Sequence, residues 1–195
     1  MLQWIPYHFI IKGHSMEHEQ DLAQLHASSL DNRSLTMNIL VTPSMSNFSG
    51  LMHGGELLKI LDQVAYACAT RYCGVGVITL SVDSVTFRQP IPIGTLLTFL
   101  ASVNHTGKTS CEVGIKVISE NIKERFVTHC VSCYFTMVAF KDGKSVPIPP
   151  LEPRTPDERR RYEAAIKRRE IRNQSRPKSQ NLFTQSAAQN SADAP

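Results

Sequence analysis

The residues with the clearest chemical potential lie between Pro43 and Tyr72, in the run PSMSNFSGLMHGGELLKILDQVAYACATRY. A turn-rich loop leads into His53-Gly54-Gly55, and the absence of Gly and Pro beyond it predicts a helix over Glu56–Tyr72. Backbone N–H groups at a helix N-terminus lack intrahelical partners, and the two glycines leave them uncovered. The pattern therefore predicts a place for an oxyanion, a phosphate or a polarised carbonyl oxygen.

A carboxylate, Asp62, lies within this predicted helix. At helical spacing its stripe contains Gly55, Leu58, Ala65, Tyr66 and Ala69, three of which are very small. One interpretation is that the small residues leave room beside Asp62 for a ligand. The other is that Asp62 only marks the edge of a solvated polar arc, because helical aspartates are usually exposed.

The apolar residues of the predicted helix spread over a wide arc, which is typical of a helix wrapped by other elements. Five runs rich in Val, Ile, Thr and Phe predict strands, at residues 34–41, 77–88, 96–104, 110–119 and 126–140. The turns between the later runs are short, which favours antiparallel neighbours. The sequence therefore predicts an α+β fold in which an antiparallel sheet curls around one long central helix.

Composition and charge exclude several classes of protein. A chain of 195 residues fits one domain with appendages. Residues 1–150 carry 11 basic and 11 acidic residues, so the formal excess of +4 lies entirely in residues 151–195. A neutral core predicts no nucleic-acid partner. The opening segment lacks a charged n-region and a cleavage site, so we expect neither a signal peptide nor a membrane protein.

The five cysteines are odd in number and lie within apolar patterns, which predicts buried thiols in a reducing, cytoplasmic compartment. Cys130 and Cys133 form a lone C-x-x-C in a predicted strand, where an odd spacing is expected to place the two sulfurs on opposite faces. Without a second pair of matching ligands, we expect no metal site.

The C-terminal part begins with a Pro-rich connector and continues as a capped helix. Thr155-Pro156-Asp157-Glu158 reads as a capping box, and the helix is expected to end near Arg172. Its basic face predicts a solvated helix packed loosely on the domain through Tyr162, Ala165 and Ile166. The resulting domain scheme is an N-terminal extension (1–34), a core domain (35–150), a connector with basic helix (151–172) and a disordered tail (173–195).

With these motifs in place, the sequence resembles the hotdog-fold acyl-CoA thioesterases, specifically the cytosolic acyl-CoA hydrolase group and its bacterial single-domain relatives. The resemblance covers roughly residues 35–172. It is carried by the Asn47 loop, LMHGGELLKILDQVA (51–65), ITLSVDSVTFRQPIPIGTLLTF (78–99), HTGKTSCEVGIKV (105–117) and VPIPPLEPRTPDERRRYEAA (146–165).

The resemblance implies a fold, a reaction and a set of catalytic residues. The reaction is hydrolysis of fatty acyl-CoA to a free fatty acid and coenzyme A, with no cofactor because coenzyme A is part of the substrate. Asp62 matches the catalytic carboxylate, which acts as general base on water or as a nucleophile forming an anhydride. Asn47 matches the asparagine that assists it from the partner subunit. Gly55 matches the backbone N–H donor to the thioester carbonyl.

The resemblance also implies substrate contacts and an assembly. His53 and Gly54 would line the site, and Lys108, Thr109 and Ser110 would contact the nucleotide of coenzyme A through a basic, hydroxyl-rich turn. The expected assembly is at least a homodimer with sites at its interface, or a hexamer built as a trimer of dimers.

Two other functions are kept open. A hotdog hydratase or dehydratase needs a histidine paired with an acid, and His53 with Glu56 could imitate that pair. A non-hydrolytic acyl-CoA binding or sensor protein would usually carry a DNA-binding helix-turn-helix, for which residues 1–34 are too short and poorly patterned.

Overall fold

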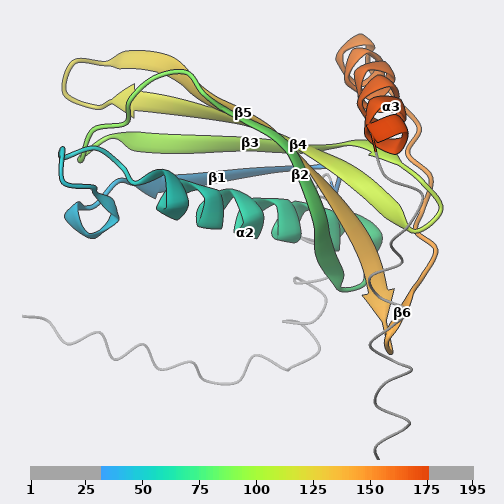
Figure 1. Cartoon of the computed structure of the whole chain (residues 1–195). Coiled ribbons are helices and arrows are strands. Elements are labelled where there is room, and N and C mark those ends of the chain that lie inside the picture. The colour runs from blue at the N-terminus through green and yellow to red at the C-terminus, as the bar shows by residue number, and fades with distance from the viewer. Residues whose placement is uncertain (1–31, 176–195) are drawn as a thin grey trace, which may run out of the picture.

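A computed structural model of the chain describes residues 32–175, which form one curled sheet with a helix on each face (Figure 1). The elements are β1 (Ser34–Leu40), a 3-10 turn η1 (Pro43–Met45), α2 (Gly54–Cys73), β2 (Val77–Phe87), β3 (Leu96–Thr106), β4 (Ser110–Asn121), β5 (Phe126–Lys141), β6 (Lys144–Ser145) and α3 (Pro156–Ser175). All five predicted strands and both predicted helices are therefore present, with ends shifted by a few residues.

Within residues 32–175 the strands pair only antiparallel, in the order β1-β3-β4-β5-β2, and the short β6 pairs with β5. The expectation that short turns join neighbouring strands is confirmed for β3, β4 and β5. It is wrong for β2 and β3, because β4 and β5 lie between them in the sheet. The connection between them is anchored on the loop before α2, where the Met52 amide donates to the Ile91 carbonyl at 2.8 Å. This leaves β2 as an edge strand, unpaired along its outer side within residues 32–175.

Helix α2 fills the concave face of the sheet (Figure 1) and supplies much of the core. Its buried positions are Leu57, Ile60, Leu61, Val64, Ala65, Cys68, Ala69, Tyr72 and Cys73. This breadth confirms the wide apolar arc predicted from the sequence. The helix ends at Gly74, whose φ of 68° is the left-handed conformation that glycine adopts without strain.

The two cysteines of the C-x-x-C run do not lie on opposite faces, so that expectation is wrong. The β4–β5 register pairs Val117 with Val131 and Ile118 with His129, which leaves Cys130 as an extra residue in β5. A bulge of this kind interrupts the alternation of side chains. Both thiols are therefore fully buried, and they donate to carbonyl oxygens of β4 rather than to a shared ligand.

Helix α3 lies on the opposite, convex face of the sheet (Figure 1). Its predicted capping box is confirmed, since the Glu158 amide donates to Thr155 Oγ1 at 3.2 Å and the Thr155 amide donates to Glu158 Oε2 at 3.3 Å. The helix continues to Ser175, so the predicted end at Arg172 is three residues early. Residues 173–175, assigned to the tail, are thus helical.

The prediction of a loosely packed α3 is wrong. Arg168 makes a two-pronged ion pair with Glu112 of β4, at 2.6 and 3.1 Å, and its guanidinium lies 3.7 Å from the ring centroid of Tyr134. Arg172 pairs with Asp83 of β2. Basic side chains therefore dock this helix, together with Ala165, which is buried, and Tyr162, which packs against His105.

Most of the predicted N-terminal extension (1–34) and tail (173–195) lies outside the described residues. Neither helix within residues 32–175 is long and apolar enough to span a membrane.

Candidate active site

The loop before α2 is organised by the side chain of Asn47. Its amide oxygen accepts hydrogen bonds from the Ser49 amide at 2.9 Å and from the Leu51 amide at 3.2 Å. Gly50, at φ 72°, completes the turn in a conformation that favours glycine. Because the loop uses the oxygen of Asn47, its NH₂ group is the part left to act on a ligand.

The N-terminus of α2 is capped by His53, whose Nδ1 accepts a hydrogen bond from the Gly55 amide at 3.0 Å. Gly55 thus lies at the helix N-terminus as predicted. Its N–H is already engaged, however, by a residue that was predicted only to line the site. For this amide to bind a substrate oxygen, the His53 ring has to turn aside.

Asp62 lies on the exposed side of α2, where its Oδ1 accepts a hydrogen bond from the hydroxyl of Thr79 at 2.6 Å. The register between β2 and β5 shifts just after Thr79, so the strand is irregular at this point. Ala65 and Ala69 of the predicted stripe are completely buried, whereas Leu58 and Tyr66 are exposed. In the protomer Asp62 therefore belongs to the polar arc, yet it is oriented by a strand residue that sequence reasoning missed.

Exposed apolar side chains lie on α2 and on the edge strand β2. Leu58 and Tyr66, one helical turn before and after Asp62, are 39% and 48% exposed, and Val82 and Phe87 of β2 are 44% and 50% exposed. An unpaired edge strand next to exposed apolar side chains is a typical site for association with another chain. The surroundings of Asp62 are thus incomplete in the single protomer.

Asn47 and Asp62 do not share a cavity within one protomer. Asn47, Gly54, Leu57 and Phe87 are among the residues that line a hollow of about 410 Å³, and Asp62 is not one of its lining residues. Asp62 follows Gly55 by seven residues, which is about 10 Å along the helix axis. The structure therefore brings Asn47 together with Gly54 at one end of α2 and leaves Asp62 at its middle.

The turn predicted to contact the nucleotide lies at the other end of the molecule. Lys108 is exposed, and its carbonyl accepts a hydrogen bond from the Ile148 amide in the connector, which also contacts Tyr72 at the end of α2. Gly55 and Tyr72 are roughly 25 Å apart along the helix. Thr109 lies in this same turn and Ser110 begins β4, so one protomer does not bring Lys108, Thr109 and Ser110 to the thioester end.

A second basic side chain accompanies this turn. The guanidinium of Arg169 in α3 lies 3.2 Å from the position that a Cβ on Gly107 would occupy. Lys108 and Arg169 are thus two cations at this turn, and the second was not predicted from the sequence.

No group of three or more metal-ligating side chains occurs within residues 32–175.

The curled antiparallel sheet around a central helix is the hotdog fold. Comparison with known proteins agrees: residues 49–125 match the family model described as Thioesterase superfamily. Protein VdlD of Helicobacter pylori is 62% identical over 142 residues, which cover 73% of this chain and 82% of that protein. The cytosolic acyl coenzyme A thioester hydrolase of Rattus norvegicus is 34% identical over 129 residues, which cover 64% of this chain and 33% of that enzyme.

Solved structures of acyl-CoA thioesterases are also similar to this chain. An apo-hexameric acyl-CoA thioesterase is 36% identical, with a TM-score of 0.70 over 72% of this chain and 91% of its own. Structures of an acyl-CoA hydrolase from Staphylococcus aureus are 27–30% identical, with TM-scores of 0.68–0.70 over 72–83% of this chain and 86–95% of theirs. They include variants with an aspartate, a threonine or an asparagine replaced by alanine, and a complex with butyryl coenzyme A.

The fold and the comparisons together define the class as hotdog-fold thioester hydrolases. Within it, the chain belongs to the acyl-CoA thioesterase family. The family, the α+β hotdog fold and the enzyme class predicted from the sequence are confirmed.

Proposed function

We propose that this protein hydrolyses fatty acyl-CoA thioesters to a free fatty acid and coenzyme A, at sites that two protomers complete together. Asp62 acts as the general base, Asn47 of the partner subunit assists it, and the Gly55 N–H stabilises the oxyanion.

The observation that carries this proposal is the carboxylate of Asp62 held by the Thr79 hydroxyl at 2.6 Å. In the Staphylococcus aureus hydrolase, the substituted aspartate follows the asparagine by 15 positions and the substituted threonine follows the aspartate by 17. Asn47, Asp62 and Thr79 have the same two separations here. This agreement supports a common site formed by the three residues.

The chemistry follows from what each group can donate or accept. Asp62 takes a proton from water while the water oxygen attacks the thioester carbonyl carbon. The carbonyl oxygen becomes an oxyanion, which accepts the Gly55 N–H after the His53 ring has turned aside. The C–S bond then breaks, the fatty acid is released, and the coenzyme A thiolate takes up the proton.

The proposed dimer follows from the incomplete surroundings of Asp62. Pairing the β2 edges of two protomers would cover Val82 and Phe87 and bring the Asn47 hollow of one protomer to Asp62 of the other. The hexameric structure of a similar thioesterase supports further assembly of such dimers. We propose a homodimer as the minimal unit and a trimer of dimers as the complete particle.

The remaining parts of the proposal concern compartment and substrate binding. All five cysteines lie in the described part of the chain as buried free thiols, which suits the cytoplasm, as does the similarity to a cytosolic hydrolase. The reaction as written needs no metal or separate cofactor. Lys108, Thr109 and Ser110 are proposed to bind the nucleotide of coenzyme A, with Arg169 as an additional cation.

The hydratase alternative finds less support. His53 Nδ1 is occupied by the Gly55 N–H, and the carboxylate of Glu56 lies 3.6 Å from Lys59. No interaction among the described residues therefore holds the His53 ring and the Glu56 carboxylate toward each other.

The test is thiol release from acyl-CoAs of increasing chain length, from acetyl to palmitoyl. Asp62→Asn keeps the shape of the side chain but cannot take the proton, so kcat should fall about 10²–10⁴-fold. Gln63→Ala, on the same exposed arc, is the matched control and should retain activity. Near wild-type thiol release by Asp62→Asn would overturn the assignment, and a preference for acetyl-CoA would overturn the fatty acyl part alone.

A further inference from the structure

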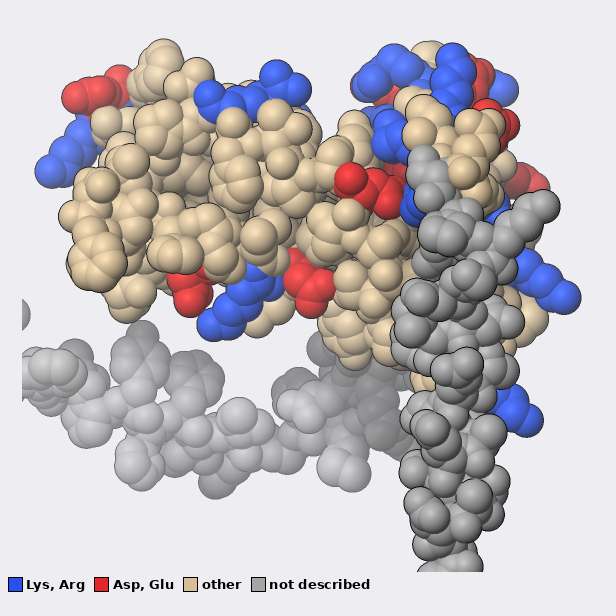
Figure 2. All heavy atoms as spheres, in the orientation of Figure 1, with Lys and Arg blue, Asp and Glu red and all other residues tan. Residues whose placement is uncertain are grey.

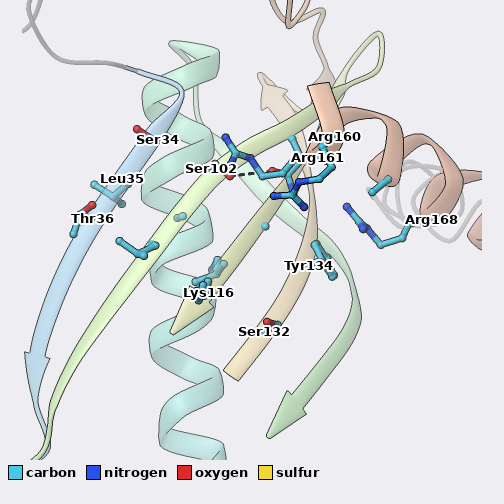
Figure 3. A pocket seen from close by; sticks show the side chains of 16 residues that line it. Ser34, Leu35, Thr36, Ser102, Lys116, Ser132, Tyr134, Arg160, Arg161 and Arg168 are labelled. Carbon is cyan, nitrogen blue, oxygen red and sulfur yellow. Dashed lines mark hydrogen bonds between the residues drawn. The ribbon is translucent and has the colours of Figure 1, made fainter. Parts of the chain in front are cut away.

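A second cavity, separate from the thioester site, lies on the convex face of the sheet under α3. Its volume is about 430 Å³. Figure 3 shows the side chains that line it. Helix α2, which carries Asp62, packs on the concave face (Figure 1), so the sheet separates the two places within a protomer. Nothing in the mechanism above uses this cavity.

The floor of the cavity consists of two rows of side chains that run across neighbouring strands. The register gives the rows as Ser34-Ser102-Gly114-Tyr134 and Thr36-Leu100-Lys116-Ser132. Hydroxyl groups and one lysine thus face the cavity from the sheet. The exposed side chain of Leu100, opposite Lys116, adds apolar surface.

The roof is one side of α3. Arg160, Arg161, Ala164 and Arg168 line the cavity, and Figure 3 shows the three arginine side chains extending from the helix toward the strands. Arg160, Ala164 and Arg168 follow one another at intervals of four residues, and Arg161 precedes Ala164 by three, so the four positions lie on neighbouring parts of one helix face. Figure 2 shows the concentration of basic side chains on this helix.

The charges in the cavity are not balanced. Of the described residues, four basic side chains line it and no acidic one does. Arg168 is neutralised by Glu112, and Arg160 lies 3.4 Å from Asp157. Lys116 and Arg161 have no ion-pair partner among residues 32–175. Two cations that line one cavity without a carboxylate repel each other, and a doubly charged anion in the cavity would relieve that repulsion.

One edge of the cavity is rigid. The guanidinium of Arg168 is fixed by its two-pronged contact with Glu112 and by the Tyr134 ring beneath it. A fixed guanidinium, a second arginine and hydroxyl donors are the groups that recognise phosphate oxygens. The volume lies in the range of small-molecule sites.

We propose that this cavity binds an organic phosphate, with Lys116 and Arg161 contacting the phosphoryl group and Leu100 contacting the organic part. The phosphate comes either from a free nucleotide or from the nucleotide end of a coenzyme A substrate. The second source rests on the proposed function and would place the nucleotide of coenzyme A in this cavity instead of at the Lys108 turn, whereas the first source does not depend on that function.

The test uses the full chain and the double variant Lys116→Gln/Arg161→Gln. Arg159→Gln/Lys167→Gln is the matched control, because these two exposed α3 residues do not line the cavity. Binding of adenosine 5′-diphosphate is measured by titration calorimetry, and KM and kcat are measured with acyl-CoA. None of the four residues belongs to the proposed catalytic machinery, so kcat should stay unchanged in both variants.

For a free nucleotide, the cavity variant should bind adenosine 5′-diphosphate at least about tenfold more weakly than the control, with the KM for acyl-CoA unchanged. If the substrate's own nucleotide occupies the cavity, the KM for acyl-CoA should rise about tenfold instead. Equal binding and equal KM in the cavity and control variants would overturn the proposal. Asp62→Asn should bind adenosine 5′-diphosphate like the wild type, which separates this test from that of the hydrolase.

Discussion

Replacing Arg168 by Met should destabilise the protein through the carboxylate that it leaves behind. The side chain of Glu112 is 4% exposed, and that of Arg168 is 24% exposed. Without the guanidinium, the only remaining side-chain hydrogen bond to Glu112 in the described structure is the one from Asn104 Nδ2 at 3.3 Å. The variant therefore has a buried charge with one weak partner.

The size of the effect follows from this burial. Breaking a buried ion pair by removing one partner usually costs about 3–5 kcal/mol. Arg168 is partly hydrated already, so we expect the lower end of that range, about 3 kcal/mol, including the lost contact with the Tyr134 ring. The double variant Glu112→Gln/Arg168→Met removes both charges and should recover more than half of the loss.

Urea unfolding followed by circular dichroism, at one fixed protein concentration, measures these free energies. If Arg168→Met lowers the free energy of unfolding by less than about 1 kcal/mol at pH 7.5, the reasoning is refuted and α3 is only loosely docked. A double variant no more stable than Arg168→Met would show that the buried charge is not the cause.

Two further predictions concern single side chains. Thr79→Val removes the hydroxyl that orients Asp62 and should lower kcat about tenfold in the thiol-release assay. Thr79→Ser keeps the hydrogen bond, so its kcat should stay close to that of the wild type. Equal rates for the two variants would argue against an orienting role of Thr79. The pKa of His105 is lowered, by burial first and by Arg169 and Arg172, although Glu112 raises it. In mild acid the unfolded chain therefore binds more protons than the folded chain. The free energy of unfolding should fall as the pH drops below the ordinary histidine pKa near 6.5. The variant His105→Phe can still pack on Tyr162. Between pH 7 and pH 5 its free energy of unfolding in urea should fall less than that of the wild type, and the two slopes should differ by at most about 1.4 kcal/mol per pH unit. Identical slopes would show that His105 does not cause the pH dependence.

The sequence was sufficient to predict the helices and strands because their patterns are local. The breadth of the apolar arc of α2 and the β-rich runs after it depend only on neighbouring residues. The order of strands does not: β2 follows α2 directly in the chain, yet lies at the sheet edge beyond β5. That placement depends on how the sheet curls around α2 and on the contact of Ile91 with Met52, which are long-range features.

The candidate site was predictable as far as its residues share one local motif. The spacing of Asn47, Gly55 and Asp62 along the chain placed them correctly on the loop, at the helix N-terminus and on the helix. Thr79 gave no signal, because many threonines occur in predicted strands and only the tertiary fold shows which one meets Asp62. His53 was expected to line the site, but not to occupy the amide of Gly55.

The docking of α3 was the largest difference. Glu112 alternates with Gly114 and Lys116 in β4, which by pattern indicates a solvent-facing side chain. Its partner, Arg168, is 56 residues away and lies in a run of basic residues that looks entirely solvated. Only the folded structure shows that one arginine of that run pairs with a buried carboxylate and that another lines a cavity.

The central claim, a thioester site shared between two protomers, is tested most directly by one purified heterodimer. One chain carries Asn47→Ala and the other Asp62→Ala, with different affinity tags. If Asn47 of one protomer serves Asp62 of the other, one site keeps both residues and the other loses both. The account predicts that this heterodimer hydrolyses acyl-CoA at about half the wild-type rate per dimer, whereas both parent homodimers are nearly inactive. A heterodimer as inactive as its parents would contradict the shared site.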